Sequence, residues 1–495
     1  MKGRPVRPLR VLMVAAECAP SVKVGGLGDA VAGLAAALAR AGHDVRVALP
    51  RYGHLPPPAP VLRFPLRLRR TVHRVAVGTA GRSGVTIRLL DVPALFGRTG
   101  VYGYAERNVF PDTDLRLAAH AQAALLDAVT DGWWPDVVHA HDAAAALALI
   151  YLRHWDDPDA RLVRAAGVLT IHNLAHQAVQ PVTALEAWEL PSALGHDGGP
   201  LAWYGRLNPM KAGILLADRV TTVSPTYARE VVADPELGAG LGTILAGRGE
   251  AFTGIRNGID TGTWDPTRDP HLPRPVDPGD PAPGRAAAAR ELSGRLDLVE
   301  EADGPLIGMV GRLDHQKGFD LALPPLAGWV RDGARVVLLG TGDPALAAAW
   351  HEAAAAHAGR VAFRERFDEA LARLIYAGAD LLLVPSRFEP CGLVQLYAMR
   401  YGAVPVAHRT GGLADTIVDA DAEPDRGTGF LFDEATPAAL DGAVRRAWTA
   451  WRDRSRWSNL QRRAMAGDWS WDGPAAAYAD LYREAVTARR GGGTT

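Results

Sequence analysis

Residues 10–42, RVLMVAAECAPSVKVGGLGDAVAGLAAALARAG, form the first strand, loop and helix of the chain. The short apolar run at 10–15 is typical of a strand buried in a parallel sheet. A glycine-rich loop follows, and an Ala/Leu-rich helix is expected from about 29 to 41, ended by Gly42. A strand that passes through such a turn into a helix opens a βαβ unit, so this stretch predicts an α/β fold with a doubly wound parallel sheet.

The same alternation continues along the chain and then restarts. Further strands are expected at 45–49, 136–140, 167–171 and 219–223, and after the restart at 305–310, 335–339, 380–384, 404–407 and 429–432. A segment dense in Pro, Asp and Gly at 264–284 is expected to be an extended connection. The sequence therefore predicts two doubly wound Rossmann-like domains facing a cleft, at 1–250 and 251–465. A final helix near 469–490, within a segment 466–495, should pack back on the first domain and end in a flexible tail.

Composition excludes several classes of protein. The 495 residues carry 54 Lys and Arg against 55 Asp and Glu, a net charge of −1, so no basic excess is available for nucleic acid. Hydrophobic residues make up 48% of the chain, which excludes a disordered protein. Two cysteines make neither a disulfide framework nor a zinc site, which favours the reducing cytoplasm. The basic start at 1–10 followed by apolar residues resembles a secretory signal, but Glu17 interrupts the run and a first strand explains it better. No apolar run reaches the ~18 residues of a membrane helix.

The first glycine-rich loop contains Lys23, Gly25 and Gly26. Adjacent glycines between a strand and a helix let backbone N–H groups approach an anion, and Lys23 adds a cation beside them. The loop is neither the G-x-G-x-x-G dinucleotide fingerprint nor a Walker loop, so a nicotinamide cofactor is not expected. A tight turn needed only for packing is the alternative.

A second loop, GRLDHQKG at 311–318, directly follows an expected strand. Ligands of open α/β sheets bind beyond the carboxyl ends of strands. Arg312 offers a planar fork of donors and Lys317 a point charge, and together they suit a diphosphate. The alternative is a solvated loop with two unrelated cations.

A third loop, SRFEPCGL at 386–393, lies between an expected strand and an expected helix at 394–400. Glu389 falls at the strand end, where a carboxylate suits recognition of sugar hydroxyls. Gly392 and Leu393 would present backbone N–H groups to an anion. Cys391 lacks a His and Asn/Asp arrangement, so a structural thiol is favoured over a nucleophile.

Three more strand ends carry polar groups or glycines. His139-Ala140-His141-Asp142 ends one strand and His172-Asn173 another, while Thr410-Gly411-Gly412 opens a helix after a third. The His-x-His pair could bind a metal, but no further ligand set is evident. Candidate functional residues thus lie at strand carboxyl ends in both halves.

These segments together resemble the bacterial glycogen and plant starch synthases, which are retaining glycosyltransferases of the two-Rossmann GT-B fold. The order and spacing of the matching segments span nearly the whole chain. They are KVGGLGD at 23–29, PDVVHAHD at 135–142, TIHNLAHQ at 170–177, NPMKAGILLADRVTTVSPTYAREV at 208–231, NGID at 257–260, GRLDHQKGFD at 311–320, GTGDP at 340–344, SRFEPCGLVQLYAMRYG at 386–402 and RTGGLADTI at 409–417.

The resemblance implies roles for individual residues. The catalytic set would be His172 next to the reacting sugar, Glu389 on the donor glucose hydroxyls, Arg312 and Lys317 on the phosphates, and Asp142 on the acceptor side. The substrate-binding set would be Lys23, Gly25, Gly26, Asn257, Cys391, Gly392, Leu393, Thr410, Gly411 and Gly412. The implied reaction moves glucose from ADP-glucose, or else UDP-glucose, to the 4-hydroxyl of an α-1,4-glucan with retention. No cofactor, metal, nucleic acid or membrane is implied.

The chain also departs from the family pattern. The family usually has His-Asp-Trp-His where this chain has His141-Asp142-Ala143-Ala144. An aromatic platform for the acceptor is therefore expected to be missing, and Ala143→Trp would be expected to restore it. The alternatives are a related glucosyltransferase with another donor or acceptor, and a catalytically weak glucan-binding homologue.

Overall fold

The computed structural model describes residues 7–103, 109–155, 159, 161–300 and 303–491. The chain divides into two compact units. The first is Met1–Asn257 with Trp471–Thr495, and the second is Gly258–Ser470. Each unit is built around its own sheet and its own apolar core. Within the described part of the chain, no helix is both long and apolar enough to cross a membrane.

The first unit contains a nine-stranded sheet in the order β12-β11-β7-β6-β1-β2-β5-β4-β3. Its strands are β1 (Arg10–Val14), β2 (Asp44–Pro50), β3 (Pro60–Leu68), β4 (Thr71–Arg82), β5 (Val85–Asp91), β6 (Val137–His141), β7 (Ala166–Ile171), β11 (Arg219–Thr222) and β12 (Phe252–Gly254). The seven strands from β12 to β5 pair in parallel, and β3 and β4 extend the edge as antiparallel strands. Strand order reverses between β1 and β6, so this is the point where a ligand crevice is expected.

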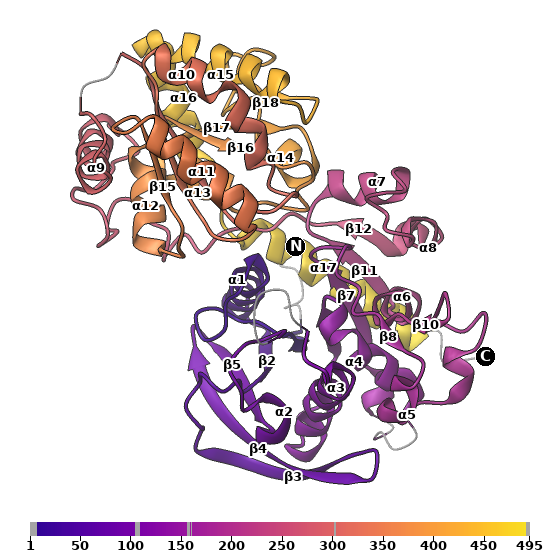
Figure 1. Ribbon diagram of the computed structural model, residues 1–495. Helices are drawn as coiled ribbons and strands as arrows, with labels where there is room; N and C mark the ends of the chain where they lie inside the picture. Colours follow the sequence, from indigo (N-terminus) through magenta and orange to yellow (C-terminus); the bar gives the residue numbers. More distant parts are fainter. Residues whose placement is uncertain (1–6, 104–108, 156–158, 160, 301–302, 492–495) are drawn as a thin grey trace. The chain divides into compact units, whose positions relative to one another are not determined.

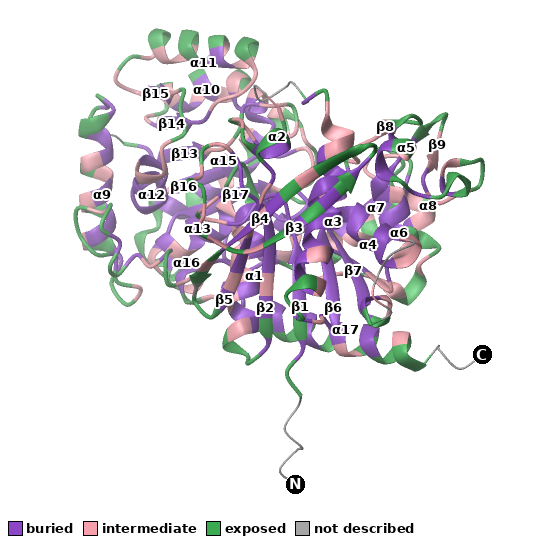
Figure 2. Cartoon of the chain, turned by 90° about the horizontal axis from the view of Figure 1, so that it is seen from below, coloured by how far each residue is buried: buried purple, intermediate pink, exposed green. Residues whose placement is uncertain are grey.

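Apolar side chains explain why these strands are central. β6 is buried at every position, and β1 at every position after Arg10, as expected for strands covered on both faces. Figure 2 shows the buried strands β1, β2, β6 and β7 together. The helices of the unit are α1 (Gly26–Arg40), α2 (Pro93–Phe96), α3 (Thr113–Thr130), α4 (Ala143–His154), α5 (Ala184–Trp188), α6 (Pro209–Leu216), α7 (Pro225–Ala233), α8 (Gly242–Ala246) and α17 (Asp472–Gly491). A small sheet adds β8 (Gln180–Pro181), β9 (Ala202–Trp203) and β10 (Arg206–Leu207).

Helix α17 returns the C-terminal end of the chain to the first unit. In Figure 1 it is the yellow helix that runs among the indigo and magenta elements. The Tyr482 hydroxyl lies 2.7 Å from His139 Nδ1, and both side chains are fully buried. Arg489 and Arg490 belong to the last turn of this helix, within the range expected for it. The final residues, 492–495, lie outside the described part of the chain.

The second unit contains a six-stranded, all-parallel sheet in the order β15-β14-β13-β16-β17-β18. Its strands are β13 (Leu306–Val310), β14 (Arg335–Leu339), β15 (Val361–Arg364), β16 (Leu381–Val384), β17 (Val404–His408) and β18 (Phe430–Phe432). Its helices are α9 (Ala282–Arg295), α10 (Leu323–Arg331), α11 (Pro344–Ala356), α12 (Glu369–Gly378), α13 (Val394–Tyr401), α14 (Gly411–Thr416), α15 (Pro437–Arg452) and α16 (Arg454–Ala466). Strand order reverses between β13 and β16, and the predicted doubly wound α/β fold is confirmed in both units.

The Pro-rich segment lies inside the second unit and has neither helix nor strand until α9 begins at Ala282. Its Trp264 ring stacks on Tyr397 with ring centroids 3.8 Å apart. Asp269 forms an ion pair of 2.8 Å with Arg373, whose guanidinium also covers the Trp264 ring at 3.9 Å. The expected extended connection is therefore a segment packed on the core of this unit.

We expect Asp269→Ala to lower the free energy of unfolding by about 3–5 kcal/mol, because it removes the buried carboxylate that accepts from both Arg373 and Tyr401 and leaves Arg373 with the partly exposed Glu369 as its ionic partner. The Asp269 side chain is 0% exposed and that of Arg373 is 4% exposed, so water cannot replace the lost carboxylate. Urea denaturation of the full chain measures the change. Asp280→Ala, at an exposed aspartate of the same segment, is the matched control and should change stability by less than about 0.5 kcal/mol. Equal effects of the two substitutions would show that the ion pair does not hold the segment.

Candidate functional site

Glu17 joins the loops at the strand-order reversal of the first unit. The residue follows β1 and is 3% exposed. Its Oε2 accepts hydrogen bonds from the N–H groups of Val24, at 2.6 Å, and Gly25, at 3.0 Å. The Tyr102 hydroxyl donates to its Oε1 at 2.7 Å. A carboxylate from one strand end therefore fixes the glycine-rich loop, a role that the sequence analysis did not assign.

The glycine-rich loop leads into α1 as predicted, but its glycines have different roles. Helix α1 begins at Gly26, three residues earlier than expected, with Gly25 as its N-cap. The N–H of Gly25 is bonded to Glu17, so Gly26 is the glycine of this pair left to face an anion. A Cβ on Gly28 would lie 2.9 Å from the Val22 carbonyl oxygen, so packing requires glycine there. Lys23 forms an ion pair of 2.9 Å with Asp29 of the same helix.

Asp142 and His172 are brought together at the ends of β6 and β7. Asp142 adopts a φ of 60°, and its Oδ1 accepts hydrogen bonds from the N–H of His172 at 2.7 Å and of Asn173 at 3.4 Å. His141 Nδ1 lies 3.1 Å from His172 Nε2. One ring nitrogen of His172 is thus engaged by His141, and the orientation of the imidazole is fixed from within the protein.

Burial determines the charge of these groups. It lowers the pKa of His139 and His172 to about 3 and that of His141 well below its ordinary value, so all three rings are neutral near pH 7. Burial also raises the pKa of Asp142 to about 7, which the two backbone N–H groups only partly offset. His139 is committed to contacts with Tyr482 and Thr170, and no group of three or more His, Cys, Asp or Glu residues suits a metal among the residues that the structure describes.

The second unit places Glu389 at its own strand-order reversal. Glu389 is 5% exposed, and its Oε2 accepts hydrogen bonds from Lys317 Nζ at 2.6 Å and from the Ser386 hydroxyl at 2.9 Å. No hydrogen bond from a described residue reaches the other oxygen, Oε1. The loops after β13 and β16 are further joined by the N–H of Arg387, which donates to the Gln316 carbonyl at 2.8 Å, and by the ion pair of Arg387 with Asp320 at 2.6 Å.

Glycines let the loops around Glu389 meet. Gly318 has a φ of 66°, and a Cβ there would lie 2.1 Å from the carbonyl oxygen of Pro385. A Cβ on Gly411 would lie 2.0 Å from the Glu389 carbonyl oxygen, and one on Gly412 would lie 2.0 Å from that of Cys391. The N–H of Gly412 donates to the Glu389 carbonyl at 3.0 Å. The loops after β13, β16 and β17 can therefore pack together only with glycine at these positions.

The remaining predicted residues differ in their burial and in their contacts with the residues around Glu389 and Asp142. Helix α13 begins at Val394 with Leu393 as its N-cap, directly after Gly392, and Cys391 is buried. Thr410 is the N-cap of α14. The Arg312 side chain is 59% exposed and pairs with Asp314 at 3.2 Å. Asn257 is buried at the end of the first unit. In the described structure no hydrogen bond connects Arg312 or Asn257 to the other predicted residues.

Four contacting residues were missed by the sequence analysis. Glu17 and Ser386 follow strands β1 and β16, so the rule that selected Glu389 could also have selected them. His141 appeared only as half of a possible metal pair. Tyr102 had no local signal, because it lies in a loop far from any expected strand end.

Comparisons with known proteins agree with this geometry. The family described as starch synthase catalytic domain matches residues 10–247, and the family described as glycosyl transferases group 1 matches residues 304–450. A glycogen synthase of Anaeromyxobacter dehalogenans (strain 2CP-C) is 45% identical, over 96% of this chain and 99% of that protein. A glycogen synthase of Halorhodospira halophila is 43% identical, over 97% of this chain and 100% of that protein.

A solved structure extends the likeness to three dimensions. The catalytic domain of starch synthase IV from Arabidopsis thaliana, bound to ADP and acarbose, is 32% identical with a TM-score of 0.90, over 97% of this chain and 100% of that one. The matches cover nearly all of this chain and nearly all of each relative. They confirm the family resemblance drawn from the motifs, and they confirm the predicted GT-B architecture. The chain therefore belongs to the glycogen and starch synthase family of glycosyltransferases.

Proposed function

We propose that the chain transfers glucose from ADP-glucose to the non-reducing 4-hydroxyl of an α-1,4-glucan, with retention of the anomeric configuration. The observation that carries the proposal is the buried contact of Lys317 with Glu389 beside the start of α13. It combines a cation and helix N–H groups, which suit a diphosphate, with a carboxylate that suits sugar hydroxyls. The relatives named glycogen synthase and the starch synthase bound to ADP support this choice of substrates.

Lys317 alone cannot stabilise the negative charge of the departing diphosphate. Lys317 and Glu389 form a pair of no net charge, so the charge that develops on the departing diphosphate needs further donors. Arg312, which is open to solvent, and the N–H groups of Gly392 and Leu393 are the groups we assign to it. Donors preorganised where charge develops supply the larger part of such catalysis. Glu389 Oε1 would accept from the donor glucose.

The residues of the first unit are assigned to the reacting sugar and the acceptor. His172 is neutral, so it can donate or accept one hydrogen bond without bringing a charge. Asp142 would accept from an acceptor hydroxyl, and Lys23 and Gly26 would approach the diphosphate. We assign no covalent nucleophile, and we place the reaction in the cytoplasm, since both cysteines are free thiols.

Transfer of radiolabelled glucose to glycogen tests the proposed function. We expect transfer from ADP-glucose in the presence of a chelator, with UDP-glucose as the parallel donor. Loss of activity with chelator that a divalent ion restores would contradict the metal-free reaction. Absence of transfer from either donor, with glycogen binding retained, would favour the weak glucan-binding homologue.

Ala143 is the residue that suggested the alternative of a catalytically weak glucan-binding homologue. The residue is 2% exposed and belongs to the apolar core at the start of α4. A tryptophan at 143 would have to enter packed space, and overpacking a core typically costs about 1–3 kcal/mol or more. The platform that Ala143→Trp is expected to restore stays a prediction, and its test needs thermal unfolding of the variant beside the apparent KM for maltooligosaccharides.

We predict that Lys317→Ala and Arg312→Ala each lower kcat by about 10²–10³, as the loss of one preorganised donor typically does. The exposed Arg290→Gln, on α9 of the same unit, is the control and should keep wild-type turnover. Steady-state kinetics with ADP-glucose measure the change. A variant that keeps more than roughly a third of the turnover would remove its residue from the diphosphate site.

Glu389→Gln should weaken binding of the sugar part of the donor without weakening binding of the nucleotide part. The amide keeps the shape but cannot accept charge-assisted hydrogen bonds, so binding of ADP-glucose should weaken by ~1.5–3 kcal/mol. ADP binding should not weaken, because ADP lacks the glucose hydroxyls and Lys317 loses the carboxylate that neutralises it. Calorimetric titration with both ligands decides the matter, and equal weakening would contradict a sugar-contacting role.

Asp142 should make acceptor binding depend on pH. Its carboxyl has a pKa of about 7 and ionises as pH rises from 6 to 8. The ionised form accepts hydrogen bonds that are ~1 kcal/mol stronger, so the apparent KM for maltooligosaccharides should fall roughly fivefold over that range. In Asp142→Asn this KM should be higher and independent of pH. A donor KM that follows the same profile would assign the titration to another group.

A further inference from the structure

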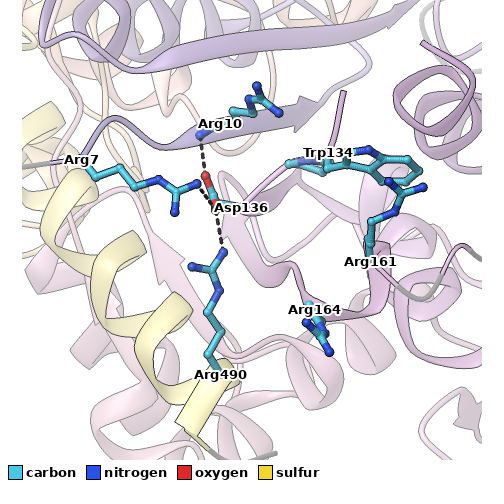
Figure 3. Close-up of a pocket in the computed structure, with 8 residues that line it drawn as sticks. Arg7, Arg10, Trp134, Asp136, Arg161, Arg164 and Arg490 are labelled. Carbon is cyan, nitrogen blue, oxygen red and sulfur yellow. Dashed lines mark hydrogen bonds and ion pairs between the residues drawn. The ribbon is translucent and has the colours of Figure 1, made fainter. Parts of the chain in front are cut away.

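Five arginines and one aspartate surround a hollow of about 380 Å³ in the first unit, on the edge of the sheet opposite the candidate site (Figure 3). Arg10 is the first residue of β1, and Asp136 directly precedes β6. The candidate residues lie at the other ends of these two strands. The remaining arginines are Arg7, Arg161, Arg164 and Arg490. Nothing in the proposed reaction uses this cluster.

Among the described residues that line the hollow, Asp136 is the only carboxylate, and its hydrogen bonds are already made. Its Oδ1 accepts from Arg490 Nη2 at 2.6 Å, and its Oδ2 accepts from the backbone N–H of Arg10 at 3.0 Å. Arg7 lies 4.0 Å away, and the Asp136 side chain is only 7% exposed. Figure 3 shows the Arg7 and Arg490 guanidinium groups turned toward it. One buried carboxylate cannot neutralise both Arg7 and Arg490.

The other arginines leave a surplus of positive charge. Arg161 pairs with Asp159 at 2.7 Å and covers the ring of Trp134 at 3.7 Å. Arg10 Nε lies 3.9 Å from Asp44. Arg164, at the end of a short 3-10 helix (Leu162–Arg164) before β7, has no ion pair in the described part of the chain. If Arg7 and Arg490 served only to attach the segments before β1 and at the end of α17 to Asp136, a further arginine at the same hollow would not be needed. Arg164 is such an arginine.

We propose that this hollow binds a compact anion with two phosphoryl groups. Guanidinium groups match phosphate oxygens bidentately, and like charges gathered at a hollow concentrate anions there. The volume falls at the small end of the ~300–1,000 Å³ of small-molecule sites. A neutral glucan would leave the cations unmatched, and nucleic acid would need a basic surface longer than one hollow.

Calorimetric titration of the full chain with pyrophosphate tests the proposal, with orthophosphate as the single-phosphate comparison. Arg164→Gln and Arg7→Gln should each weaken pyrophosphate binding at this site roughly tenfold or more, since bonds to charged groups are lost. Arg164→Lys keeps the positive charge but loses the bidentate geometry of the guanidinium group, so it should weaken pyrophosphate binding less than Arg164→Gln does. The exposed Arg290→Gln of the second unit is the matched control and should bind as wild type. Pyrophosphate should also bind at the diphosphate site proposed in the second unit. That binding contributes the same heat in every variant, so it does not affect the comparison.

The expected result is a pyrophosphate-binding component that depends on Arg164 and Arg7, is weaker for orthophosphate, and weakens with added salt. Unchanged thermal unfolding of the two glutamine variants shows that the loss is not unfolding. Pyrophosphate affinity within twofold of wild type in both variants, or the same loss in Arg290→Gln, would overturn the proposal. Tighter Arg164-dependent binding of a single-stranded oligonucleotide than of pyrophosphate would also overturn it.

Discussion

The parallel pairing of β1 with β6 and of β13 with β16 constrains both units. At each pair the strand order reverses, so the following loops turn to opposite sides, and a ligand crevice is expected there. Glu17 and Asp142 follow the strands of the first pair, and Lys317 and Glu389 follow those of the second. Each polar cluster thus sits where two neighbouring strands end, and the apolar interior of the strands holds those ends at fixed spacing. A change of register in either pair would separate the groups.

Burial gives the two clusters opposite electrostatic characters. In the second unit, Lys317 and Glu389 remain close partners, and removing either leaves the other charge buried and uncompensated. In the first unit, no carboxylate of a described residue is bonded to the His141 or His172 ring, so burial keeps both rings neutral and the two rings lie within hydrogen-bond distance of each other. The second unit thus contributes a charged pair, and the first unit contributes neutral imidazoles beside its carboxylates.

The sequence predicted β1, β2, β6, β7, β11, β13, β14, β16, β17 and β18, most of which are short, continuous apolar runs. Strands β4, β5, β12 and β15 were missed, and so was the edge strand β3, whose residues PVLRFPLRL alternate between exposed and buried and include two prolines. The residues at Lys317 and Glu389 were found because they follow buried strands and carry opposite charges. Tyr102 could not be found in this way, because its contact with Glu17 joins positions 85 residues apart. The hydrogen bonds from the glycine-rich loop to Glu17 were missed because Glu17 was considered only as the residue that interrupts the first apolar run.

The return of α17 to the first unit affects the order in which the protein can fold on the ribosome. His139 and Tyr482 are in contact across 343 positions of sequence, so the first unit stays incomplete until the last helix has been synthesised. All of the second unit, Gly258–Ser470, leaves the ribosome before that helix. At the usual rate of about 5–20 residues per second, most of the first unit waits roughly ten to fifty seconds with the surface that α17 will cover still open to solvent. Chaperones that shield apolar surface would find their main target in this interval, on the half of the chain that is made first.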